Sequence, residues 1–175
     1  MKQLKIELST QFSCSLERAF KAPILGDATR FMNGYRLQPP VVAFFDDASW
    51  GAVNGHRFPS TDGNLILRAG ILFKDQILQR IENEYWEWAI FDFQPAVLFF
   101  IDRAVGAWKV QEIQDGKIQV SYSYTFYPTT RLHYWLTVAF GVIQWKGMMK
   151  KALRGIQAQA ESGEPFRYEM SRGQA

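Results

Sequence analysis

The N-terminal residues of the chain alternate between apolar and polar side chains. A period of two over residues 4–12 is typical of a strand with one dry face and one wet face. The side chains on the predicted inner face are Leu4, Ile6, Leu8, Thr10 and Phe12. We therefore predict that the chain begins with a strand.

Two short helices are predicted to follow this strand. Ser15 offers a side-chain oxygen that caps a first helix, which the pattern carries to Pro23. Asp27 caps a second helix that runs through Met32, where Asn33-Gly34 supplies residues that tolerate positive φ.

From Val41 to Tyr127 the pattern indicates an antiparallel meander. Short runs of β-branched and aromatic residues replace any sustained helical period. Turns are predicted at five dipeptides, namely Asp46-Asp47, Asn54-Gly55, Asp62-Gly63, Lys74-Asp75 and Asp115-Gly116. The last of these suits a tight type I′ turn. The strand after it should turn one face inward, which carries Ile118, Val120, Tyr122, Tyr124 and Phe126.

After Pro128 the apolar positions repeat every three or four residues, which predicts a long amphipathic helix from near Leu132 to near Ala160. Its apolar stripe is Trp135, Val138, Val142, Trp145, Met149, Ala152 and Ile156. Pro165 and the small polar end of the chain do not continue a helix. We predict one domain over residues 1–160 and a C-terminal tail over residues 161–175.

Composition narrows the class of protein. A chain of 175 residues normally forms one core, and 47% of its residues are hydrophobic and 15% aromatic. The net charge is only +3 and no block of Lys and Arg occurs, so we expect no nucleic-acid partner. The single cysteine, Cys14, excludes an intrachain disulfide and fits a cytoplasmic location. No secretory signal pattern and no apolar stretch long enough for a membrane span occurs.

The order of strand, two short helices, meander and long helix resembles the α+β helix-grip fold of the START and Bet v 1-like (SRPBCC) superfamily. The segment SCSLERAF resembles that fold's entry from the first strand into the first helix. The segment DRAVGAWKVQEIQDGKIQVSYSYTFYP, with Gly106 and Trp108, resembles the penultimate hairpin of its polyketide cyclase/dehydrase-like branch. The resemblance implies a curved sheet wrapped around the last helix and an internal apolar cavity. It implies no reaction, because the superfamily has no shared catalytic signature.

A ligand-binding role is predicted for the aromatic residues of the last strand and the last helix. If their faces meet, rings and a few hydroxyls line a cavity for a lipid, a sterol-like molecule or an aromatic polyketide-like molecule. The residues of this predicted lining are Tyr122, Tyr124, Phe126, Trp135, Val138, Val142 and Trp145. The alternative is that these rings simply fill the core.

Polar candidates for chemistry lie in the meander. His56-Arg57 can meet a carboxylate at a cavity mouth, or can lie in a solvated loop. A buried carboxylate with a raised pKa can act as a general base in a cyclisation. The carboxylates considered are Asp46, Asp47, Glu82, Glu84, Glu87, Asp92 and Asp102. Asp92 is the most unusual, since it lies between Phe91 and Phe93, although a position facing water on the other face of the strand explains it more simply.

The basic residues of the last helix, Lys146, Lys150, Lys151 and Arg154, suit either an anionic membrane surface or an ordinary wet helix face. The sequence has no phosphate-binding loop, nucleophile elbow or metal-ligand spacing, so we predict no cofactor and no metal. The leading hypothesis is a binding or carrier protein for a small hydrophobic molecule. Its alternatives are a cyclase or dehydratase that uses the same cavity, and a filled core whose rim binds a protein. The sequence leaves open whether the protein forms a weak homodimer.

Overall fold

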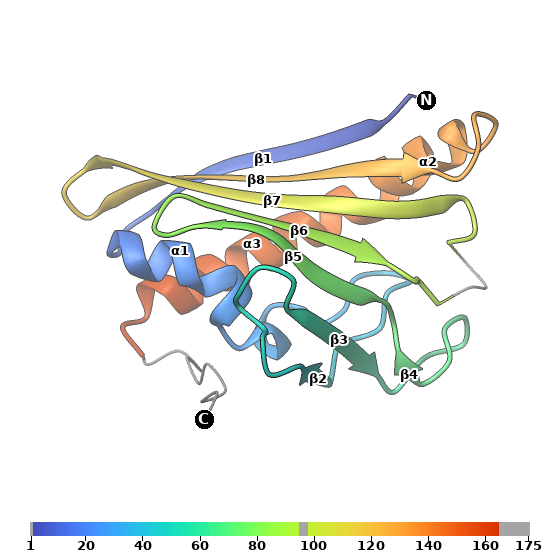
Figure 1. Ribbon diagram of the computed structural model, residues 1–175, viewed down its shortest axis with the longest axis horizontal. Helices are drawn as coiled ribbons and strands as arrows, with labels where there is room; N and C mark the ends of the chain where they lie inside the picture. Colours follow the sequence, from blue (N-terminus) through green and yellow to red (C-terminus); the bar gives the residue numbers. More distant parts are fainter. Residues whose placement is uncertain (1, 95–97, 165–175) are drawn as a thin grey trace.

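The computed structural model describes residues 2–94 and 98–164, and its centre is an eight-stranded antiparallel sheet (Figure 1). The strands follow the order β1-β8-β7-β6-β5-β3-β2, and β4 pairs with β3. Their bounds are β1 Leu4–Phe12, β2 Ala43–Asp46, β3 His56–Thr61, β4 Gly70–Ile71, β5 Lys74–Ile81, β6 Tyr85–Phe91, β7 Ile101–Gln114 and β8 Lys117–Pro128. The helical segments are α1 Leu16–Leu25, η1 Ala28–Arg30, α2 Tyr134–Phe140, η2 Gly141–Trp145 and α3 Lys146–Glu161. The predicted α+β class and the antiparallel meander are confirmed.

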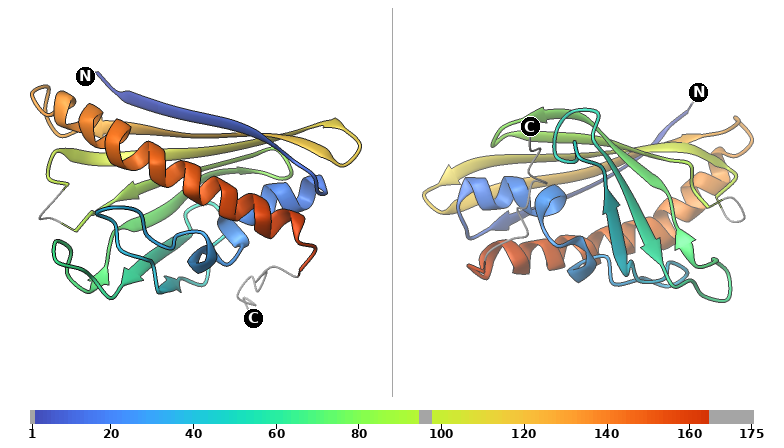
Figure 2. Two further views of the ribbon diagram at one scale, coloured as in Figure 1. Left: turned by 180° about the vertical axis from the view of Figure 1, so that it is seen from behind. Right: turned by 60° about the horizontal axis from the view of Figure 1, so that its bottom comes forward.

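The long C-terminal helix lies across one face of the curved sheet (Figure 2). It consists of α2, the π-helical turn η2 and α3, and the backbone stays in the right-handed helical region at Gly141 and Lys146 where these join. Arg18 at the start of α1 donates to the Ala160 carbonyl at the end of α3, at 2.7 Å. This bond ties the short helix to the far end of the long one.

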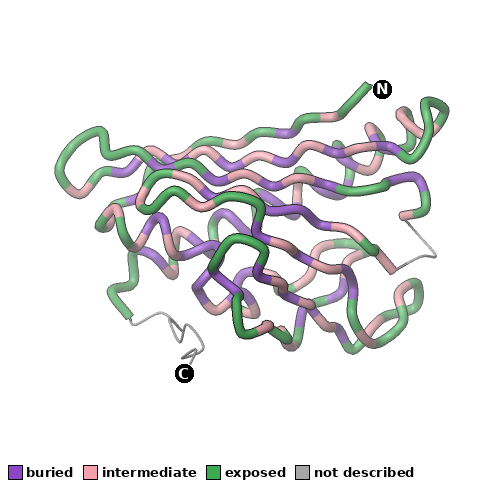
Figure 3. Tube along the Cα trace, viewed as in Figure 1, coloured by how far each residue is buried: buried purple, intermediate pink, exposed green. Residues whose placement is uncertain are grey.

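Burial alternates along the strands (Figure 3). On β8 every second residue from Ile118 to Pro128 is buried, as predicted from the pattern, and β1 pairs with it from Leu4↔Phe126 to Phe12↔Ile118. The aromatic face of β8 therefore points into the core between the sheet and the helices.

The first helix is longer than predicted, because Pro23 does not end it. Proline has no N–H to donate to the carbonyl four residues earlier, which is that of Ala19. The indole N–H of Trp108 donates to this carbonyl instead, at 3.0 Å. The Trp86 indole likewise donates to the Phe20 carbonyl at 2.9 Å. Both tryptophans thus connect the sheet to α1. The predicted caps Ser15 and Asp27 are confirmed, each accepting from a backbone N–H of the following helix.

The apolar stripe of the last helix is correct from Trp145 onward and wrong before it. The side chains of Trp135 and Val142 are 72% and 58% exposed, whereas Thr137 and Gly141 are buried. A π turn takes one residue more than an α turn, so it shifts the residues that share a face. The inward face upstream of Trp145 therefore falls on Thr137 and Gly141.

Two predicted turns also differ from the structure. At Asp115-Gly116 only Gly116 has a positive φ, of 67°, so the turn is not type I′, and the register shifts between Glu112 and Gln114. Lys74-Asp75 is not a turn, because both residues begin β5. The assignment of residues 1–160 to one domain and 161–175 to a tail stays a prediction, and residues 165–175 lie outside the described part.

Candidate functional site

An apolar groove lies between the beginning of the long helix and the loops beside β4 and β6. Its volume is about 550 Å³, within the range of small-molecule sites. The helix contributes Leu136, Ala139, Phe140 and Ile143, and the facing loops contribute Leu67 and Phe93. The groove is therefore large enough and apolar enough to hold a small hydrophobic molecule.

A second, smaller cavity lies deeper, between α1, α3 and the sheet. Its volume is about 70 Å³, and three of its lining residues, Gln38, Phe73 and Trp145, also line the groove. The two spaces therefore adjoin. The inner cavity has room for a few water molecules or for one end of a ligand.

Arg57 is a buried cation of the inner cavity. Its side chain lies on β3, is buried, and donates two hydrogen bonds to Asp46 on β2, at 2.7 and 2.8 Å. The guanidinium carbon also lies 4.7 Å from the ring centre of Phe44 and 4.3 Å from that of Trp50. The ion pair neutralises the buried charge, and the two rings fix the plane of the guanidinium.

Asp75 is the buried carboxyl of this cavity. It lies on β5 directly opposite Arg57 in the register and is 8% exposed. No residue that the structure describes hydrogen-bonds to its carboxyl or lies within ion-pair distance of it. Burial raises the pKa of Asp75 to about 7; the positive charge of Arg57 opposes this rise and the negative charge of Asp46 adds to it.

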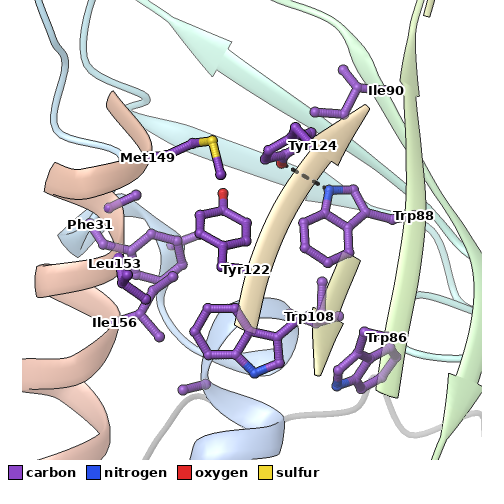
Figure 4. Packing of buried hydrophobic residues seen from close by; sticks show 14 of the residues in the cluster. Phe31, Trp86, Trp88, Ile90, Trp108, Tyr122, Tyr124, Met149, Leu153 and Ile156 are labelled. Carbon is purple, nitrogen blue, oxygen red and sulfur yellow. Dashed lines mark hydrogen bonds between the residues drawn. The ribbon is translucent and has the colours of Figure 1, made fainter. Parts of the chain in front are cut away.

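Two tyrosines of β8 complete the polar part of the cavity (Figure 4). The Trp88 indole donates to the Tyr124 hydroxyl at 3.0 Å, and the Tyr122 ring lies beside that of Tyr124, with their ring centres 5.5 Å apart. Burial raises the pKa of both hydroxyls, so both keep their protons at neutral pH. Trp88 packs against Gly106 on β7, where a Cβ atom would lie 2.4 Å from the indole ring. This close approach explains the glycine of the hairpin.

The structure brings together only part of the predicted lining. Tyr122, Tyr124 and Trp145 line the inner cavity, and Trp145 also lines the groove. Phe126 is fully buried, with its ring centre 5.2 Å from that of Trp145, and supports the lining from behind. Val138 is half-buried and lines neither space. Trp135 and Val142 point to solvent because of the π turn, so placing them in an internal lining was wrong.

The structure places the polar candidates in different environments. His56 pairs with Asp47 at 3.1 Å near the surface, whereas its neighbour Arg57 points inward because successive residues of a strand face opposite sides. Asp92 is 58% exposed and pairs with Lys74 at 2.8 Å, so it faces water. Among residues 2–94 and 98–164 no cluster of metal-ligating side chains occurs, and none of the described helices is both long and apolar enough to cross a membrane.

Asp75 is the residue that the sequence analysis missed. The sequence pattern predicts a turn at Lys74-Asp75, where the structure has the start of a strand. The available signal was the alternation of Phe73, Asp75 and Ile77, which places a carboxyl on the apolar face of a strand.

Comparison with known proteins supports the fold and nothing finer. No family model and no curated protein matches the sequence. Among solved structures, Ara h 8.0201 is similar with a TM-score of 0.67 at 13% identity, over 93% of this chain and 100% of that one. Norcoclaurine synthase from Thalictrum flavum, in complex with dopamine and hydroxybenzaldehyde, gives 0.65 at 8% identity, over 94% and 90%. A protein from Nitrosospira multiformis gives 0.62 at 14% identity, over 91% and 97%.

The chain has the Bet v 1-like helix-grip fold. This confirms the fold that the sequence resemblance implies. The resemblance to the polyketide cyclase/dehydrase-like branch stays a prediction, because identities of 8% to 14% show the fold alone.

Proposed function

We propose that this protein binds or carries a small hydrophobic molecule, of the lipid, sterol-like or aromatic polyketide-like class, in the groove beside the long helix. The observation that carries the proposal is the apolar volume of about 550 Å³, which large side chains leave unfilled. Burial of apolar surface would supply the affinity. The free thiol of Cys14 fits a cytoplasmic location.

A second candidate function is catalysis of the cyclase or dehydratase kind in the same space. The observation that favours it is Asp75, because a buried carboxyl with a pKa of about 7 can take up or release a proton near neutral pH. Norcoclaurine synthase shows that the same fold carries an enzyme. Turnover of a candidate substrate that Asp75→Asn abolishes, while binding persists, would support this function.

The groove should bind one environment-sensitive apolar dye per folded chain. Ala139 lines the groove from an exposed helical position, so Ala139→Trp should fill the space without disturbing the core. We expect the dye to bind this variant about tenfold or more weakly. A fluorescence titration of the folded protein measures the dissociation constant of the dye for the wild type and for the variant. Circular dichroism checks that the variant is folded.

The matched control is Ala158→Trp, at an exposed position of α3 that lines neither space. It should leave dye affinity unchanged. Dye that binds only as the protein unfolds would contradict the proposed function, as would an equal loss of binding in both variants.

A further inference from the structure

We infer that the inner cavity receives a neutral hydroxyl group at the end of an otherwise apolar ligand, with the Asp75 carboxylate accepting from that hydroxyl and the Tyr122 hydroxyl donating to it. This inference rests on the proposed function, because the apolar body of the ligand occupies the groove. The inference adds to the proposed function the chemical class of the ligand and names the end of the ligand that the protein holds.

The first argument is the unmet acceptor. Asp75 is buried and lines the cavity, yet no described residue donates a hydrogen bond to its carboxyl. Its nearest cation, Arg57, directs two of its N–H groups at Asp46 instead. Buried polar groups normally have a hydrogen-bond partner, so the carboxyl lacks a donor that a ligand can bring.

The second argument is a hydroxyl donor in the same cavity. The Tyr124 hydroxyl already accepts from the Trp88 indole, whereas the hydroxyl of the neighbouring Tyr122 lines the same space as Asp75. A tyrosine hydroxyl carries a proton that it can donate. A site with a carboxylate acceptor and a hydroxyl donor matches a group that both donates and accepts, which is a property of an alcohol or a phenol.

The third argument is charge. The charged groups that act on Asp75 are Arg57 on β3 and its partner Asp46 on β2, while β8 presents the protonated Tyr122 and Tyr124. Lys151 on α3 also lines the cavity, from an exposed position where its ammonium group donates to the Gly34 carbonyl at 2.7 Å. A ligand carboxylate would lie beside the Asp75 carboxylate, and a ligand ammonium would lie near the Arg57 guanidinium and lose its hydration. A neutral group avoids both costs.

The sizes of the two spaces set the orientation. The inner cavity of about 70 Å³ has room for a small end group but not for a ring system, whereas the groove of about 550 Å³ holds the apolar body. Because Gln38, Phe73 and Trp145 line both spaces, one molecule can occupy the groove and reach Asp75.

The experiment compares three probes of one shape, namely 2-naphthol, 2-methylnaphthalene and 2-naphthoate, by isothermal titration calorimetry at pH 8. The wild-type protein should bind naphthol about tenfold more tightly than methylnaphthalene, and naphthoate most weakly. Hydrogen bonds to charged groups are stronger than those between neutral groups. Asp75→Asn should therefore reduce the preference for naphthol over methylnaphthalene about fivefold or more. Tyr122→Phe should reduce it by a smaller factor. Tyr124 is left intact because Trp88 depends on its hydroxyl.

The matched control is Asp92→Asn, the same change at an exposed carboxylate outside both spaces. It should leave all three affinities unchanged. A second measurement is the pH profile: lowering the pH through about 7 protonates Asp75, so naphthol affinity should fall in the wild type, while the Asp75→Asn profile stays flat.

The outcomes separate the inference from the proposed function. If naphthol and methylnaphthalene bind with equal affinity and Asp75→Asn changes neither affinity, the proposed binding in the groove is supported and the hydroxyl site is wrong. If naphthoate binds most tightly, the ligand class is wrong. If no probe binds the folded wild-type protein, both the inference and the proposed function fail.

Discussion

Trp145→Ala is expected to lower the free energy of unfolding by about 3 to 5 kcal/mol. The indole is 3% exposed and contacts the rings of Tyr124, Phe126 and Phe140 with centre distances of 5.1 to 5.8 Å. Its N–H has no hydrogen-bond partner among the described residues, so the loss comes from packing. Removing the ring leaves a void between the helix and the sheet.

Trp135→Ala provides the control for this prediction, because it removes the same side chain from the same helix on the exposed side. Its effect should stay within about 0.5 kcal/mol. Urea unfolding followed by circular dichroism measures both values. Similar losses in the two variants would mean that the helix does not face the sheet as the π turn dictates.

Asp75→Asn is expected to make the protein more stable above neutral pH, by up to about 4 kcal/mol. The pKa of Asp75 is raised from 3.8 to about 7 in the folded state, and each pH unit of difference corresponds to about 1.4 kcal/mol. Between about pH 4 and pH 7 the folded protein holds a proton that the unfolded chain has lost. The free energy of unfolding therefore falls as pH rises through this window and levels off above it. An uncharged asparagine removes this fall.

The measurement is urea unfolding at several pH values from 4 to 9. The variant should match the wild type near pH 4 and exceed it increasingly up to about pH 8, whereas Asp92→Asn should follow the wild-type profile. Parallel profiles for Asp75→Asn and the wild type would show that Asp75 titrates normally, and would remove the unmet carboxylate on which the hydroxyl site depends.

Local sequence determined much of the fold, because regular hydrophobic periods encode elements directly. The alternation along Leu4–Phe12 and Lys117–Pro128 identified two strands and the inward face of the second. The three-to-four repeat after Pro128 identified the long helix, and Ser15 and Asp27 marked two helix starts. Each of these signals depends only on residues within a few positions of one another.

Tertiary contacts explain the two places where these local signals predicted the helices wrongly, namely the end of α1 and the inward face of the long helix. Pro23 stays within α1 because Trp108, 85 residues further along the chain, donates to the carbonyl that the proline leaves free. The side that the helix presents upstream of Trp145 depends on the π turn, where Gly141 packs so closely on Leu4 that a Cβ atom would lie 2.3 Å from it. No local period reports such a contact.

The candidate site depended most on the tertiary structure. Strand alternation alone predicts that Tyr122 and Tyr124 face inward. It did not determine that Asp75 and Arg57 lie opposite each other beneath those hydroxyls, because two charged residues are ordinarily turn or surface signals. A charge is stable inside only where a partner from another strand compensates it, as Asp46 does for Arg57. That pairing exists only once β2, β3 and β5 are assembled side by side.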